Sequence, residues 1–250
     1  NIEKIIFEKT SSLLNSKIIV SRQNDEETLN KIKKTLKSNS SKKIFFNDLF
    51  SYSLNENNFF YYEDEFGSLR LPIPNLEGEF QLSNASTAIA TLRNIDDIKV
   101  TDKNIKDGIT KIKSIARFQE IKFGKIKNLV KNNKLYIDSS HNPLGAKVLM
   151  EHLNKLNCKK HIILGMMANK DHSEYASFFK DKISSITTID IPNQKNSIPG
   201  IDLMKKLKNF QSINYKNSIY EALRSLKLEN TDIVIVTGSI YLAGEVLNLN

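Results

Sequence analysis

The chain has 250 residues, of which 40% are hydrophobic and 26% are charged. That length suits one large domain or two modest ones, and it is enough to bury a sizeable core. No stretch approaches the roughly 18 consecutive apolar residues of a membrane span, and the N-terminus lacks the layout of a signal peptide. The single cysteine, Cys158, suits a reducing compartment. We therefore expect a cytoplasmic protein with no membrane partner.

The formal net charge of +9 makes nucleic-acid binding one hypothesis, but nearly all of the basic residues are lysines. Arginine is the residue favoured for bidentate contacts with phosphates and bases. The only arginines are Arg22, Arg70, Arg93, Arg117 and Arg224. Because the lysines are dispersed among acidic and polar residues, a solvated basic surface is favoured, and no nucleic-acid partner is expected.

The first half of the chain predicts a mixture of short elements. In order they are a strand at 17–20, a helix over 25–37, a strand at 43–46, a hairpin over 59–74, and helices over 85–92 and 101–113. These are too few elements for a covered sheet. Since the sequence also starts at Asn1 rather than methionine, this half is interpreted as the back end of a domain whose front is absent.

From about residue 114 the pattern becomes regular. Two short strand-like pieces, 120–123 and 126–130, come first, and strands then alternate with helices. The expected strands are 134–139, 161–167, 186–191, 212–215 and 233–237, and the expected helices are 143–156, 173–182, 201–210, 218–228 and 241–247. This alternation predicts βαβ units and a mostly parallel, doubly wound α/β domain. We place the domain boundary near 114–117.

Three polar segments follow predicted strands and precede predicted helices. They are Asp138-Ser139-Ser140-His141-Asn142, Asn169-Lys170-Asp171 and Thr237-Gly238-Ser239. Ligands of open parallel sheets bind outside the carboxyl ends of the strands, where helix N-termini also favour anions. The candidate binding site is therefore expected at these three segments.

Each candidate residue also has a simpler structural interpretation. Asp138 suits a ribose hydroxyl or a metal-bound water, or else it caps the next helix. His141 suits a phosphate, a carboxylate substrate or a proton shuttle, or else it is a surface histidine. Lys170 with Asp171 suits an anion ligand and its orienting partner, or else a solvated charge pair.

Two further positions are also compatible with either a binding role or a structural role. Gly238-Ser239 is either a turn that presents N–H and hydroxyl donors or a simple strand–helix turn. Arg117, at the predicted domain junction, is either a phosphate clamp or an inter-domain salt bridge. The sequence contains no G-x-x-x-x-G-K-[ST] phosphate loop, no G-x-G-x-x-G and no Cys/His metal cluster, and its first glycine is Gly67. Any nucleoside triphosphate chemistry therefore needs a phosphate loop from outside this chain.

Six stretches carry a family resemblance. They are the segment from Glu8-Lys9 to Val20, QLSNA at 81–85, ARFQ at 116–119, YIDSSHNP at 136–143, GMMANKD at 165–171 and VTGSIY at 236–241. In this order, over essentially the whole chain, they resemble the motifs E-K-A-G-I-x-K-x-G-x-P-V-V, H-Q-x-x-N-A, G-R-F-Q, D-G-A-H-N-P, G-M-x-x-D-K-D and T-G-S-[FL]-Y. These motifs are those of the folylpolyglutamate synthase / dihydrofolate synthase family of Mur-type ATP-dependent amide ligases.

The resemblance implies a fold and a reaction. Residues 1–114 would be the C-terminal part of a Mur-ligase ATP-binding central domain without its phosphate loop, and 115–250 a complete Rossmann-like C-terminal domain. ATP would phosphorylate the carboxylate of a folate or dihydropteroate, and L-glutamate would attack the acyl phosphate to give an amide, ADP and phosphate. A monomer is expected, and the isolated chain is expected to be inactive.

The resemblance also implies residue roles. Asn84 would contact the adenine, Arg117 the nucleotide phosphates and Asp138 the ribose. The catalytic residues near the incoming glutamate would be His141, Lys170, Asp171 and Ser239. Lys9 matches the lysine that can be carbamylated in the family, and a carbamate oxygen is a ligand suited to Mg²⁺.

The sequence departs from the family motifs at several positions. Ala116 stands where the family has glycine, and Ser139-Ser140 replaces Gly-Ala. Three alternatives stay open: a Mur-type cell-wall precursor ligase, a non-catalytic nucleotide- or partner-binding module, and a nucleic-acid binder. The TGSIY stretch favours the folate branch over the cell-wall branch, and scarce arginine argues against nucleic acid.

Overall fold

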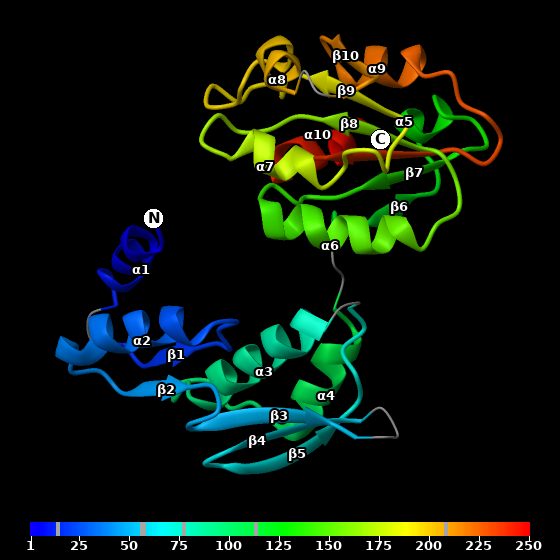
Figure 1. The fold of residues 1–250 in the computed structure, drawn as a ribbon. Coiled ribbons are helices and arrows are strands. Elements are labelled where there is room, and N and C mark those ends of the chain that lie inside the picture. The colour runs from blue at the N-terminus through cyan, green and yellow to red at the C-terminus, as the bar shows by residue number, and fades with distance from the viewer. Residues whose placement is uncertain (14–15, 56–58, 77–78, 113–114, 208–209) are drawn as a thin grey trace. The chain divides into compact units, whose positions relative to one another are not determined.

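The computed structural model describes residues 1–13, 16–55, 59–76, 79–112, 115–207 and 210–250. The chain divides into two units, Asn1–Lys113 and Ser114–Asn250 (Figure 1). Each unit has its own core, and each is described by itself. Within the described ranges, no helix combines the length and the apolar character that crossing a bilayer requires.

The first unit combines four α-helices with two small sheets among its described residues. Its elements are α1 (Ile2–Thr10), β1 (Ile18–Val20), α2 (Glu26–Thr35), the 3₁₀ turn η1 (Leu36–Ser38), β2 (Lys43–Phe45), β3 (Phe50–Leu54), β4 (Phe60–Asp64), β5 (Gly67–Leu71), α3 (Glu79–Arg93) and α4 (Asp102–Thr110). Strands β1 and β2 pair in parallel, and β3, β4 and β5 form an antiparallel meander. The predicted hairpin corresponds to β4 and β5.

The meander is covered by helices, which corrects the expectation that this half has too few elements to cover a sheet. Phe60, Tyr62 and Leu71 are buried against residues of α3 and α4, including Ile89 and Ile105. Strand β3, which the sequence prediction missed, completes the meander through Phe50. Its alternation of apolar and polar residues is the signal that could have found it.

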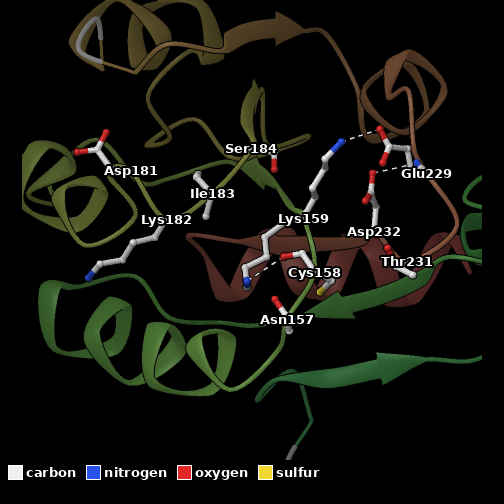
Figure 2. Close-up of a pocket in the computed structure, with 11 residues that line it drawn as sticks. Asn157, Cys158, Lys159, Asp181, Lys182, Ile183, Ser184, Glu229, Thr231 and Asp232 are labelled. Atoms are coloured by element: carbon white, nitrogen blue, oxygen red, sulfur yellow. Dashed lines mark hydrogen bonds and ion pairs between the residues drawn. The ribbon is translucent and has the colours of Figure 1, made fainter.

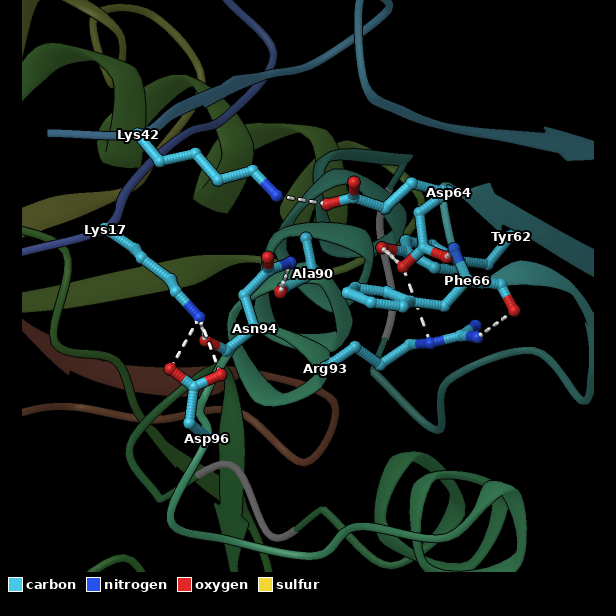
Figure 3. A network of polar contacts seen from close by, with 10 residues as sticks. Lys17, Lys42, Tyr62, Asp64, Phe66, Ala90, Arg93, Asn94 and Asp96 are labelled. Atoms are coloured by element: carbon cyan, nitrogen blue, oxygen red, sulfur yellow. Dashed lines mark hydrogen bonds and ion pairs between the residues drawn. The ribbon is translucent and has the colours of Figure 1, made fainter.

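A polar cluster joins the β4–β5 hairpin to the end of α3 (Figure 3). The Arg93 side chain donates to Phe66 O at 2.9 Å and lies 3.5 Å from the Asp64 carboxylate, which also accepts from the Tyr62 hydroxyl at 2.9 Å. Burial, together with the bond to Asp64, raises the pKa of Tyr62, so this hydroxyl stays protonated. Because the Arg93 guanidinium is held in this way, its role in the structure is to fasten the hairpin.

The second unit contains one six-stranded sheet with helices in its connections. Its elements are β6 (Gln119–Ile121), α5 (Lys125–Asn128), β7 (Lys134–Ile137), α6 (Pro143–Asn154), β8 (Lys160–Leu164), α7 (His172–Ser177), β9 (Ser185–Ile189), α8 (Gly200–Lys206), β10 (Ile213–Lys216), α9 (Ile219–Ser225), β11 (Ile233–Thr237) and α10 (Ile240–Leu249). The strand order is β10-β9-β8-β11-β7-β6, and every pairing is parallel except that of β6 with β7.

Each face of this sheet has its own apolar core. Side chains of α5, α9 and α10 pack on one face, and side chains of α6, α7 and α8 pack on the other. Strand β11 is buried throughout because it lies between two neighbours and beneath both cores. The predicted α/β class with a mostly parallel sheet is confirmed, since parallel strands covered on both faces are what a run of βαβ units produces.

Several predicted elements differ in the structure. The sequence prediction contains no element corresponding to α1, and the helix expected over 85–92 spans Glu79–Arg93. The strand expected at 126–130 is wrong, because the chain forms the short helix α5 there. Ile126 and Val130 are both buried, and their spacing of four residues fits one face of a helix turn as well as one face of a strand, so the sequence pattern alone does not distinguish the two. The helix expected over 173–182 begins one residue earlier and ends at Ser177.

Candidate functional site

The carboxyl ends of β7, β11 and β8 bring the three polar segments together. The order β7-β11-β8 makes these strands neighbours, and backbone hydrogen bonds continue past their ends. Asp138 N donates to Val236 O at 2.9 Å, Gly238 N to Ser140 O at 3.0 Å, and Gly165 N to Thr237 O at 3.2 Å. The segments 138–142, 165–171 and 237–239 therefore form one continuous edge, called here the carboxyl edge.

Asp138 is buried, with 7% of its surface exposed, and both of its carboxylate oxygens accept backbone hydrogen bonds. The donors are Phe118 N and Ser140 N, each at 2.9 Å. The simpler interpretation, in which Asp138 caps the next helix, is wrong, because Asn142 caps α6 through Gly145 N. Since each carboxylate oxygen can accept a further bond, Asp138 can still receive a ligand hydroxyl if the turn opens slightly.

His141 is half-buried, and its ring has a defined tautomer. Its Nδ1 lies 3.0 Å from Ser139 O, and a carbonyl can only accept, so Nδ1 carries the proton. The other ring nitrogen, Nε2, is thereby left as an acceptor. An imidazole in this state can receive a proton or a ligand N–H at the carboxyl edge.

A buried triangle of hydroxyl groups lies beneath this edge, and sequence reasoning did not find it. Ser140 Oγ is 2.9 Å from the Tyr175 hydroxyl and 3.1 Å from Thr237 Oγ1, and the last two are 2.9 Å apart. Burial raises the pKa of Tyr175, so its hydroxyl remains a donor. Because Tyr175 lies on α7, this helix is tied to both β7 and β11.

Arg117 lies in a tightly wound turn before β6. Its neighbours Ala116 and Phe118 both adopt left-handed backbone angles, with φ of 55° and 46°. The turn is held by Ser139 N, which donates to Ala116 O at 2.7 Å, and by the bond from Phe118 N to Asp138. A left-handed residue explains why the family motif has glycine where this chain has Ala116.

The guanidinium of Arg117 is available for a ligand. The side chain is exposed, and no described residue forms a hydrogen bond or ion pair with it. A free arginine beside Asp138 is suited to bidentate contacts with an anion.

The segment 165–171 departs from one sequence interpretation. Asp171 does not pair with Lys170. Its Oδ1 accepts from Glu174 N at 2.9 Å and caps α7. Lys170 makes no hydrogen bond or ion pair through its ammonium with any described residue. Lys170 is thus a half-buried cation without a partner in the described part of the chain, and Asp171 fixes the helix that follows it.

Gly238 and Ser239 have structural roles at the end of β11. Gly238 has a φ of 104°, and a Cβ at this position would lie 2.6 Å from Gly165 O. The hydroxyl of Ser239, a residue only 1% exposed, accepts from Tyr241 N at 3.2 Å and caps α10. Both residues thus shape the strand–helix turn, and the role of Ser239 near the incoming glutamate stays a prediction.

Two predicted site residues lie in the first unit. Asn84 is exposed on α3, where its side chain donates to Gln81 Oε1 at 3.0 Å. Lys9 is exposed near the end of α1 and lies 3.5 Å from Glu8 Oε1. No group of three or more His, Cys, Asp or Glu side chains suited to a metal ion occurs within the described ranges. These residues alone do not assemble a Mg²⁺ site, so the metal role of Lys9 stays a prediction.

A pocket of about 490 Å³ lies at the amino ends of β8, β9 and β11, away from the carboxyl edge (Figure 2). None of the predicted site residues lines it. Its charged lining consists of three lysines and three carboxylates, namely Lys159, Lys160, Lys182, Asp181, Glu229 and Asp232. Because these charges balance, the pocket has no net attraction for a polyanion such as ATP.

A buried cluster of hydrogen-bonded side chains lies at this pocket. His161 Nε2 is 3.2 Å from Asp232 Oδ2, and His161 Nδ1 is 2.8 Å from Ser185 Oγ. Burial alone would raise the pKa of Asp232, but the bond from Glu229 N and the contact with His161 outweigh it and lower the pKa. This cluster links residues at or next to the starts of β8, β9 and β11 and stabilises the amino edge of the sheet.

The fold of the second unit is that of a Rossmann-like domain, a mostly parallel sheet covered by helices on both faces. The chain belongs to the Mur ligase family, since residues 116–240, half of its length, match the family described as Mur ligase, glutamate ligase domain. No curated protein matches the chain.

Solved structures share the fold over the whole chain. Escherichia coli FolC in complex with DHPP and ADP is 21% identical, with a TM-score of 0.72, over 98% of this chain and 56% of that one. The folylpolyglutamate synthase of Thermotoga maritima is 21% identical, with a TM-score of 0.68, over 98% of this chain and 57% of that one. The folylpolyglutamate synthase of Mycobacterium tuberculosis, complexed with ADP and AMPPCP, is 16% identical and has a TM-score of 0.75. The match covers 100% of this chain and 59% of that one. The chain thus spans less than two thirds of these relatives.

Proposed function

We propose that this chain contributes the glutamate ligase domain, and part of the ATP-binding domain, of an ADP-forming ligase that joins L-glutamate to a folate or dihydropteroate. The observation that carries this proposal is the carboxyl edge. It combines Asp138, the acceptor nitrogen of His141, and the free cations Arg117 and Lys170 within a Mur ligase family domain.

The proposed reaction has two steps. A carboxylate oxygen of the folate or dihydropteroate attacks the γ-phosphorus of ATP, and ADP leaves. The amine nitrogen of L-glutamate then attacks the acyl carbon, loses a proton and expels phosphate, which leaves an amide. Every substrate and product of these steps is anionic, so cations that have no protein partner are the groups that the reaction needs.

Nucleotide contacts are assigned by motif and supported by geometry. Arg117 is proposed to bind the nucleotide phosphates, because its guanidinium is exposed and unpaired among the described residues. Asp138 is proposed to accept from the ribose hydroxyls through the lone pairs that Phe118 N and Ser140 N leave free. Asn84, on α3 of the first unit, is proposed to contact the adenine through its exposed amide.

Glutamate contacts are proposed for His141 and Lys170. The ammonium of Lys170 suits a carboxylate of the incoming glutamate, and His141 Nε2 suits an N–H of its amine. A histidine in this tautomer can also take the proton that the amine loses. Asp171 and Ser239 support this site indirectly, because they cap the helices that follow its loops.

Magnesium enters this proposal only as an expectation from the family. A structure of the related Yersinia pestis enzyme is described as complexed with AMPPNP and Mn ion. The described residues of this chain do not gather a ligand set, so no step is assigned to a metal here. We propose that residues 1–114 are the back part of the ATP-binding domain and 115–250 the ligase domain.

The test measures phosphate release from ATP by the whole polypeptide in which this chain occurs. Release that requires both L-glutamate and a folate or dihydropteroate supports the proposal. Release with a muramyl precursor instead would establish the cell-wall alternative. The 250-residue chain alone is expected to release no phosphate, because its sequence contains no loop to enclose the β- and γ-phosphates.

A further inference from the structure

His172, the first residue of α7, lies directly after Lys170 and Asp171 and is 4% exposed. Its Nε2 is 3.0 Å from Met167 O, and its Nδ1 is 3.4 Å from the ammonium of Lys206. A carbonyl can only accept a hydrogen bond, and an ammonium can only donate one. The ring must therefore carry its proton on Nε2, accept at Nδ1, and be neutral.

The carbonyl that His172 holds is the anchor of the turn that carries Lys170. Met167 O accepts from Lys170 N at 3.3 Å as well as from the imidazole. The other contacts of the turn are Ala168 N to Asn196 O at 2.9 Å and the cap that Asp171 provides. The buried imidazole is thus the side chain that supports the exposed part of the turn from below.

Protonation would break this arrangement. A second ring proton would place Nδ1–H against the ammonium of Lys206, which comes from the last residue of α8. Burial lowers the pKa of His172, and the charge of Lys206 lowers it further. The Met167 carbonyl and the Asp171 carboxylate act in the opposite direction but do not outweigh them.

We propose that His172 is a positioning residue for the Lys170–Asp171 turn, and that Lys206 keeps its imidazole in the neutral form that holds the turn. The consequence for catalysis rests on the proposed ligase function, in which Lys170 binds glutamate. The turn would be in place at neutral pH, and acid would release it when the ring gains its second proton.

The test follows the 250-residue chain by ¹⁵N NMR between pH 8 and pH 5. The imidazole of His172 is expected to be in the Nε2–H tautomer at pH 8, and to titrate below the usual 6.5 of histidine. The amide signals of Lys170 and Asp171 are expected to move with the same midpoint. Amides that do not follow the ring, or an Nδ1–H tautomer at pH 8, would overturn the proposal.

Two variants separate positioning from simple packing. His172→Gln keeps an N–H donor near Met167 O, so the turn amides should keep their wild-type positions at pH 8 and stop titrating. Lys206→Met should raise the pH midpoint of the His172 titration, because this variant lacks the ammonium that repels a second ring proton. A midpoint that Lys206→Met leaves unchanged would contradict the role of Lys206.

These readouts need no ligase activity. A failed ligase assay with an intact titration of the turn counts against the proposed function alone. The opposite result is also possible. If the whole polypeptide proves to be a ligase but the amide signals of Lys170 and Asp171 do not follow the titration of His172, this inference alone fails.

Discussion

The two edges of the second sheet differ in how they use their polar groups. At the amino edge, polar groups are paired: Asp232 forms a hydrogen bond with His161, and Lys159 forms an ion pair with Glu229 at 2.6 Å. At the carboxyl edge, Arg117 and Lys170 have no partner among the described residues, and the hydrogen bonds instead fix the backbone around them. The difference teaches that a pocket is not by itself the better candidate site, because the cations without a described partner lie at the other edge.

The largest expected effect comes from Gly238→Ala at the carboxyl edge. The new Cβ would lie 2.6 Å from Gly165 O, on a residue with a φ of 104°. Strain and overlap together should lower the free energy of unfolding by at least about 3 kcal/mol in a urea titration. Gly244→Ala is the matched control, since its Cβ meets open space on α10 and should add about 0.5 kcal/mol of stability. Equal effects of the two changes would contradict this account of the edge.

Asp232→Ala tests whether the amino edge is built for stability. It should lower the free energy of unfolding by about 2 kcal/mol at pH 7, because a buried, charged hydrogen-bonding partner is lost. The native pKa of Asp232 is lowered, so its contribution is complete above its unfolded pKa of about 3.9 and is lost as the pH falls through the native value. In urea titrations from pH 5 to pH 2.5, the difference in free energy of unfolding between the wild type and Asp232→Ala should therefore become smaller. Asp202→Asn, on an exposed pair, should cost less than about 1 kcal/mol.

Arg117→Gln tests the free cation of the carboxyl edge. ADP binding to the chain, followed by NMR titration, should weaken about tenfold, or about 1.4 kcal/mol, while stability stays nearly unchanged. Arg224→Gln, at the end of α9, provides the control and should leave ADP affinity as it is. If both changes weakened binding equally, general positive charge rather than a specific site would explain it.

Tyr175→Phe should have the smallest effect. The hydroxyl triangle loses one neutral member while Ser140 Oγ and Thr237 Oγ1 still face each other at 3.1 Å, so about 1 kcal/mol of stability should be lost. The amide signals of Ser140 and Thr237 should nevertheless shift, because their loops lose a common support. Tyr215→Phe removes a hydroxyl bonded to Asp190 at 2.7 Å and should leave those two signals in place.

The sequence predicts the alternating elements well because each strand and helix carries its own apolar period. It misses α1 and β3 entirely, and it predicts a strand where α5 forms, because so few residues there fit either period. Contacts between residues far apart in the sequence are not predicted. Ser140, Tyr175 and Thr237 are 35 to 97 positions apart, and His161 and Asp232 are 71 apart, so no local pattern indicates their pairing.

The candidate site was predictable to a similar extent. The position of its segments after strands is a topological rule that needs no coordinates. The sequence does not predict which side chains remain available to a ligand. An aspartate or a serine at positions such as 171 and 239 is equally suited to binding a ligand and to capping a helix. Only the hydrogen bonds to Glu174 N and Tyr241 N distinguish these cases.

The place of β11 in the sheet also bears on how the second unit folds. The last strand in the sequence pairs with both β7 and β8, so it lies in the middle of the sheet rather than at an edge. Until residues 233–237 arrive, β7 and β8 expose unpaired edges, and the long-range pairing makes folding slow and cooperative. A nascent chain that stops before β11 would therefore lack the centre of its sheet, whereas one that lost β10 would lack only a border.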